Sequence, residues 1–157
     1  MLKKYLFIFF LSMVPVIELR GAIPFAVNWE LDYWTALAVC AIGNMLPVPF
    51  IYFFARKILH WGADKQYIGK FFRFCIEKGE RGGQKLTARA GRGGLFVALM
   101  LFVGIPVPGT GAWTGTLAAS FLNMGIRSTA VSVSLGVVMA GIIMGVASTG
   151  VFSIFGI

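Results

Sequence analysis

The sequence predicts an all-α integral membrane protein that forms one domain of 157 residues. Hydrophobic residues make up 58% of the chain, against roughly 45–50% in soluble domains. Two apolar segments are each interrupted by prolines and glycines, and one long apolar segment follows each of them. We therefore expect two inverted-repeat-like units, 1–55 and 95–157, each a broken or re-entrant helical hairpin plus a transmembrane helix. A basic amphipathic linker over 56–94 joins them.

The first apolar segment, 5–27, is long enough to cross a hydrocarbon core of ~30 Å as a helix. Pro15 and Pro24 interrupt it, because proline lacks a backbone donor and disfavours helix in the residue before it. Two geometries remain open, a kinked spanning helix and a hairpin that re-enters. Lys3 and Lys4 favour the spanning helix, with the N-terminus inside.

This interruption holds an acid and a base, Glu18 and Arg20. Charged side chains are costly at membrane depth and usually face each other, a substrate or water. Burial raises the pKa of a carboxyl and a nearby arginine lowers it, so Glu18 is a candidate group for proton exchange. Arg20 could bind an anionic head group or neutralise Glu18. The structural alternative is a static ion pair across a proline-bounded turn.

The second apolar segment, 34–55, fits one spanning helix. Asn44, Pro47 and Pro49 interrupt its middle. The Asn44 amide has two interpretations: it hydrogen-bonds freed backbone or the substrate, or it is a helix-packing contact. Aromatic and acidic residues over 28–34 predict an interfacial turn before this segment.

The stretch 56–92 is basic. Its ten basic and three acidic residues give it a net charge of +7, out of +8 for the whole chain. The positive-inside rule places it in the cytoplasm. Apolar residues at helical spacing over 67–75 predict an amphipathic helix on the inner leaflet. Residues 79–94, rich in glycine and arginine, are expected to be flexible. Nucleic-acid binding is not expected, because nearby lipid already explains basic and aromatic residues together.

The strongest interruption lies in the third apolar segment, 95–122, where residues 104–115 include two prolines and four glycines. A break at membrane depth survives where protein buries it or where it lines a watery cavity. We expect a re-entrant or cavity-lining loop, rather than a kinked packing helix, that meets the first interruption near the midplane. The candidate substrate and proton site is Glu18, Arg20, Pro24, Asn44, Pro106, Pro108, Gly109, Thr110, Gly111, Trp113 and Thr114.

The last apolar segment carries small residues at a spacing of four, Ser132, Gly136 and Ala140 in one stripe and Gly141 and Gly145 in another. Such stripes let helices pack closely. Four apolar segments enclose little volume, so we expect a homodimer packed partly through these stripes.

No catalytic or metal-binding set is apparent in the sequence. His60 has no neighbouring ligand set, and Cys40 and Cys75 show no paired spacing. The stretch 104–110 has the spacing of a phosphate loop but lacks its lysine. We therefore expect neither an enzyme activity nor a cofactor.

Two stretches carry a resemblance to a known family, ELRGAIP at 18–24 and PVPGTGAWTG at 106–115. They resemble the signature stretches of the small multidrug export protein family, and the similarity extends over nearly the whole chain. That family is distantly similar to the DedA/VTT (SNARE-associated) membrane proteins, whose two re-entrant hairpins are implicated in proton-dependent lipid translocation. The resemblance implies a small transporter-like protein. The chain departs from the DedA pattern at Thr110, where an arginine is expected.

These observations predict a multi-pass protein of the cell (inner) membrane that moves a small amphipathic or lipid-like substrate, coupled to protons through Glu18. The expected partners are membrane lipids, the substrate, protons and a second copy of the chain, without nucleic acid. The alternative is a non-transporting membrane organiser whose basic linker binds anionic lipid or partner proteins.

Overall fold

The structure, a computed structural model, describes residues 1–15, 17–107 and 110–155. Over these residues the fold is all-α, as predicted, and contains no strand. The helices are α1 (Leu2–Met13), α2 (Glu18–Asn28), α3 (Tyr33–Met45), α4 (Val48–Ala63), α5 (Gly69–Gly104), α6 (Ala112–Phe121) and α7 (Ile126–Phe155).

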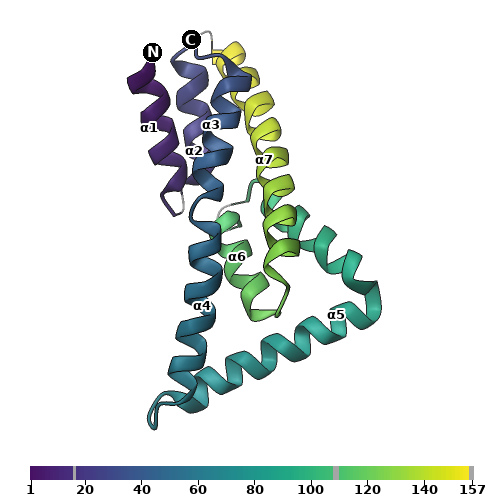
Figure 1. Ribbon diagram of the computed structural model, residues 1–157. Coiled ribbons are helices and arrows are strands. Elements are labelled where there is room, and N and C mark those ends of the chain that lie inside the picture. The colour runs from purple at the N-terminus through teal and green to yellow at the C-terminus, as the bar shows by residue number, and fades with distance from the viewer. Residues whose placement is uncertain (16, 108–109, 156–157) are drawn as a thin grey trace.

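In the described part of the chain, two helical segments are long and apolar enough to cross a membrane, Tyr33–Ala63 and Ile126–Gly150. The first comprises α3 and α4, which meet at Leu46 and Pro47 and continue in nearly the same direction (Figure 1). Both segments overlap stretches in which the sequence predicts spanning helices. The α7 side chains Val131 and Val146 are exposed, as lipid-facing side chains would be.

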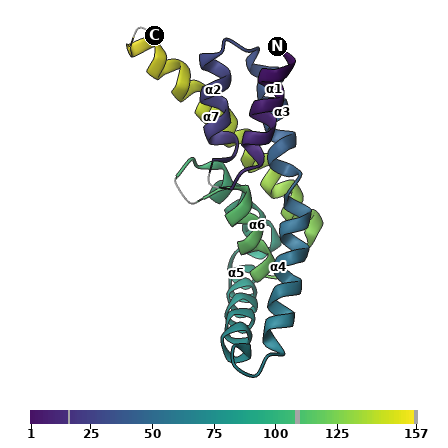
Figure 2. The same ribbon diagram turned by 90° about the vertical axis from the view of Figure 1, so that its left-hand side faces the viewer.

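Two helical hairpins lie beside these long segments. In the first, α1 ends at Met13, α2 begins at Glu18, and the two helices pack against each other (Figures 1 and 2). In the second, α5 ends at Gly104, α6 begins at Ala112, and the last part of α5 packs against α6. The two hairpins approach from opposite ends of the molecule, and the helix ends that they bring together lie near its middle (Figure 2).

The sequence predicts breaks at both Pro15 and Pro24, but only the first is a break. α2 begins at Glu18 and continues through Pro24. Because proline has no N–H, the carbonyl of Arg20, four residues earlier, loses its usual intrahelical donor. Pro24 therefore frees one acceptor without ending the helix.

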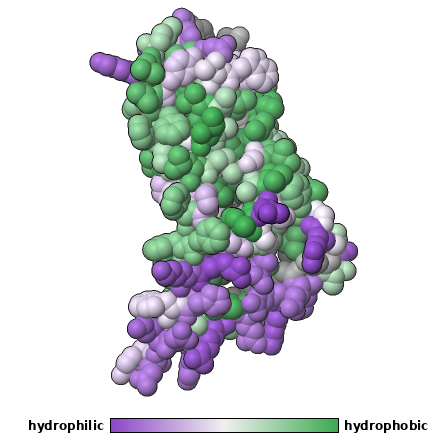
Figure 3. Space-filling model, in the orientation of Figure 1, coloured by the Kyte–Doolittle hydropathy of each residue, from purple (hydrophilic) through white to green (hydrophobic). Residues whose placement is uncertain are grey.

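The expectation of a flexible stretch over 79–94 is wrong, since α5 runs through it. The helix departs from helical geometry at Gly91, where φ is 70° and ψ is 178°. Glycine adopts such a positive φ without steric cost. The bend divides α5 into a basic leg, residues 69–90, and an apolar leg, residues 92–104 (Figure 1). Hydrophilic residues gather at the end of the molecule that holds the basic leg and the end of α4 (Figure 3).

The small residues of α7 pack against the same chain. A Cβ on Gly136 would lie 2.7 Å from the carbonyl oxygen of Met100 in α5. A Cβ on Gly141 would lie 2.2 Å from Leu37 Cδ1 in α3. Both stripes are therefore covered from within, and a homodimer would need another surface than the one the sequence suggested.

Candidate functional site

The two hairpin turns are joined by the first turn of α2. Its first residue, Glu18, is 6% exposed and has a φ of 50°. A left-handed conformation in a residue other than glycine costs of order 1–3 kcal/mol and persists where the surroundings impose it. The surroundings here are the start of α6, toward which the carboxylate points.

Glu18 caps the N-terminus of α6. Its Oε2 accepts a hydrogen bond from the backbone N–H of Ala112 at 3.2 Å, and its Oε1 accepts one from Trp113 at 3.1 Å. The first amides of a helix have no partner within the helix and lie at the positive end of its dipole. A buried carboxylate is therefore matched here by donors and by charge.

Gly111 makes this contact sterically possible. A Cβ at residue 111 would lie 2.1 Å from Glu18 Oε2 and 2.6 Å from Glu18 Cδ. Gly111 is buried and extended, with a φ of 176°, so its backbone conformation is open to any residue and only the space excludes a side chain. Gly111 of the second signature stretch thus leaves the space that the Glu18 carboxylate of the first stretch occupies.

Arg20 caps the opposite side of the same break. Its Nη2 donates to the carbonyl oxygens of Val103 at 3.0 Å and Ile105 at 3.1 Å, and its Nη1 donates to that of Val107. The last carbonyls of a helix lack intrahelical donors and lie at the negative end of the dipole. The guanidinium fork satisfies several of them at once.

The two charges of α2 therefore stabilise the two helix ends at the break between α5 and α6. Among the described residues, Glu18 and Arg20 form no ion pair with each other. The static pair considered from the sequence is replaced by two separate caps, one acidic and one basic. Each lies where the helix dipole favours its sign.

Thr110 and Trp113 strengthen the junction. Thr110 Oγ1 accepts a hydrogen bond from Arg20 Nη2 at 3.1 Å, so the residue that stands in place of the expected arginine is contacted by the arginine of the other hairpin. Trp113 Nε1 donates to the carbonyl oxygen of Met13 at 3.2 Å, which ties α6 to the end of α1. Thr114 is exposed, and its hydroxyl donates to the Gly111 carbonyl at 3.4 Å.

The remaining predicted site residues either take no part in the two caps or lie outside the described residues. Pro106 is in the turn between α5 and α6, and Pro24 is inside α2. Pro108 and Gly109 lie outside the described residues. Asn44, 2% exposed at the end of α3, has no hydrogen-bond partner for Oδ1 in the described part of the chain. Over the residues that the structure describes, no hydrogen bond or ion pair joins Asn44 to Glu18 or Arg20.

Sequence reasoning missed the backbone half of the site, which is the amides of Ala112 and Trp113 and the carbonyls of residues 103, 105 and 107. Backbone groups have no sequence letter. A signal did exist, because a break in an apolar helix leaves unpaired donors on one side and unpaired acceptors on the other. An acid and a base elsewhere in the chain are the side chains that such ends require.

The fold and the site define a helical membrane protein in which an acid and a base from one hairpin hold the broken helix of another. A sequence model of the family described as Putative small multi-drug export protein matches residues 18–143. The chain belongs to this family, as its two signature stretches predict. The match begins at Glu18 and includes every described residue of the two caps. Neither a curated protein nor a solved structure matches the chain.

Proposed function

We propose that this protein moves a small amphipathic or lipid-like substrate across the cell (inner) membrane, coupled to protons at Glu18. In this proposal the protein is multi-pass, both hairpins are re-entrant and related as an inverted repeat, and the basic stretch 56–94 is cytoplasmic. The export family and the arrangement of the two hairpin turns support it (Figure 2). The distant likeness to DedA proteins supports a lipid-like substrate.

One observation carries the proposal: the carboxylate that joins the two hairpins is a buried, titratable group. A carboxylate accepts with both oxygens, whereas a protonated carboxyl has one donor O–H and less acceptor capacity. Hydrogen bonds to a charged group contribute about 1.5–3 kcal/mol and those between neutral groups about 0.5–1.5 kcal/mol. Protonation of Glu18 would therefore weaken the hold of α2 on α6 and allow the junction to open.

The test is flux in proteoliposomes with an imposed pH gradient. Two probes represent the two substrate classes, ethidium for amphipathic small molecules and a fluorescent phospholipid for lipids. Glu18→Gln keeps the size of the side chain but cannot titrate. We expect pH-dependent flux of at least one probe in the unaltered protein, and flux without pH dependence in Glu18→Gln.

The matched control is Glu30→Gln, which removes an acid from the exposed part of the turn between α2 and α3. It should behave like the unaltered protein. If Glu18→Gln kept the full pH dependence, the proton role would be lost. If neither probe moved, transport of these two substrate classes would be contradicted.

A second candidate function is favoured by the exposure of the basic leg of α5. Lys85 and Arg89 are exposed there, as a surface for anionic lipid or for a partner protein would require. A membrane organiser of this kind would show no flux of either probe, and Glu18→Gln would leave its lipid or protein binding unchanged. We include a homodimer in both proposals, formed through surfaces other than the α7 stripes.

A further inference from the structure

A pocket of about 920 Å³ lies between α5 and the turn that joins α6 to α7. We propose that this pocket binds a phosphate-bearing anionic group, the headgroup of an anionic phospholipid being the source that its position favours. The proposal concerns a site separate from the Glu18 junction and does not depend on transport.

The charge of the lining favours an anion. Arg92 and Arg127 line the pocket together with one acidic residue, Glu80. Both arginines are exposed, and within the described residues neither forms an ion pair or a side-chain hydrogen bond. Guanidinium groups match phosphate oxygens in geometry and bind them with two parallel hydrogen bonds. Gln84 and Ser128 on the lining add polar groups for the remaining oxygens.

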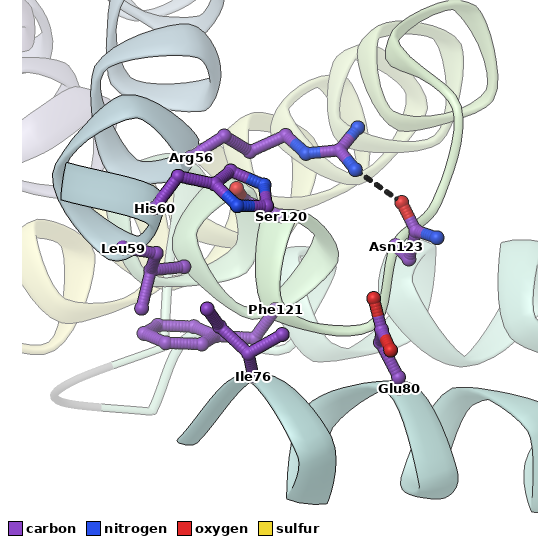
Figure 4. Close-up of a pocket in the computed structure, with 8 residues that line it drawn as sticks. All are labelled: Arg56, Leu59, His60, Ile76, Glu80, Ser120, Phe121 and Asn123. Carbon is purple, nitrogen blue, oxygen red and sulfur yellow. Dashed lines mark hydrogen bonds between the residues drawn. The ribbon is translucent and has the colours of Figure 1, made fainter. Parts of the chain in front are cut away.

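The side of the pocket nearest α4 is held in place by neighbouring contacts. Figure 4 draws the neighbouring pocket, where Arg56 Nη2 donates to Asn123 Oδ1 at 2.5 Å; Asn123 also lines the proposed pocket. Glu80 of α5 also points toward Asn123 (Figure 4). Arg56, in turn, has no carboxylate partner among the described residues, so it adds a third positive charge beside the pocket.

The pocket also has an apolar part, which favours the headgroup of a lipid over a free ion. Leu95 and Met124 line it and are 8% and 7% exposed. Arg92 and Leu95 follow directly after the bend at Gly91, where the basic leg of α5 passes into the apolar leg. The surface likewise changes from hydrophilic at the end that holds the basic leg of α5 to hydrophobic along the middle of the molecule (Figure 3). Basic pockets between membrane helices suit anionic headgroups.

The test is native mass spectrometry of the full-length protein in detergent, titrated with phosphatidylglycerol and, separately, with phosphatidylcholine. Arg92→Gln/Arg127→Gln removes both cations of the pocket. Lys3→Gln/Lys4→Gln is the matched control, because it removes the same charge from exposed positions of α1 that are not on the lining. Both double variants change exposed side chains, and elution as a single species with unchanged helix content verifies their folding.

We expect the unaltered protein to retain one phosphatidylglycerol in preference to phosphatidylcholine. The pocket variant should lose that preference by about tenfold or more, while the control retains it. Equal loss in both double variants, or equal retention of the two lipids by the unaltered protein, would overturn the proposal. A third experiment adds inorganic phosphate alone. If the pocket variant abolishes phosphate binding, and phosphate leaves the preference between the two lipids unchanged, the pocket would be assigned to soluble phosphate instead.

Discussion

At the residue scale, the contact between Gly111 and Glu18 leaves no room for a Cβ. Gly111→Ala would place that atom 2.1 Å from Glu18 Oε2 and force the carboxylate away from the α6 amides. We expect the variant to lose about 1–3 kcal/mol of unfolding free energy, the usual cost of overpacking a filled site. Denaturant unfolding in detergent micelles, followed by circular dichroism, measures this.

Gly125→Ala is the control for this substitution. Gly125 lies in the turn between α6 and α7, and a Cβ there would have no atom within 4 Å. Its unfolding free energy should stay within about 0.5 kcal/mol of the unaltered protein. Equal stability of Gly111→Ala and Gly125→Ala would show that the Glu18 carboxylate does not lie against Gly111.

The sequence singled out Glu18, Arg20 and Thr110 as site residues because charges and prolines are unusual in apolar segments, and the structure brings these three to one junction. It did not indicate their partners, since these are backbone groups. Asn44 was included for the same reason of unusual polarity, yet it lies buried at the end of α3 without a contact to the two caps. Polarity in an apolar helix marks a residue as constrained but does not say by which neighbour.

At the element scale, the bend in α5 depends on Gly91. Its φ of 70° is unfavourable for any residue with a Cβ, although the space around it is open. Gly91→Ala should therefore destabilise the protein by about 1–2 kcal/mol. Gly93→Ala, two residues on and equally open, lies in helical geometry and should stabilise it by about 0.5–1 kcal/mol. Opposite signs in one unfolding series would establish the bend; the same sign for both would contradict it.

Asp32 gives the start of α3 a pH dependence. Its carboxylate accepts from the Thr35 N–H at 2.8 Å and the Thr35 hydroxyl at 2.6 Å, and these bonds hold the pKa of Asp32 below its ordinary range. A lowered pKa means that the cap stabilises the fold above the unfolded-state pKa, and that this contribution disappears as pH falls through the folded-state pKa.

Asp32→Asn separates the cap from the charge, since asparagine caps helices about as well but does not titrate. We expect the variant to match the unaltered protein at neutral pH and to lose less stability under acid conditions. Thermal unfolding measured from neutral to acid pH would show this. Identical pH profiles for the two proteins would mean that the Asp32 bonds to Thr35 do not form.

The sequence predicted most elements but not the continuity of α5. Its glycines over 79–94 suggested flexible chain, because each interior glycine costs a helix about 1 kcal/mol. Helix propagation is cooperative, however, and once a helix is started on both sides an unfavourable interior is tolerated. The Arg81–Glu77 pair, at 2.5 Å and four residues apart, spans the start of this stretch and favours helix slightly. The one departure from helical geometry falls on a glycine, Gly91.

At the scale of the whole molecule, the two units predicted from the sequence meet through α2. The first hairpin supplies both charges and the second supplies the break that they cap. Composition alone could not predict this pairing, because it depends on how two hairpins distant in sequence are placed by the long helices between them. The central claim is that the protonation state of Glu18 decides whether the hairpins stay joined.

The most direct test of this claim is the distance between the two hairpins as a function of pH. Spin labels on Phe10→Cys in α1 and Leu117→Cys in α6, both exposed positions, report it by pulsed electron paramagnetic resonance once the two native cysteines have been replaced. We expect one short, narrow distance distribution at high pH, a longer population on acidification, and that longer population at every pH in Glu18→Gln. A single narrow distribution that changes neither with pH nor with Glu18→Gln would contradict the claim.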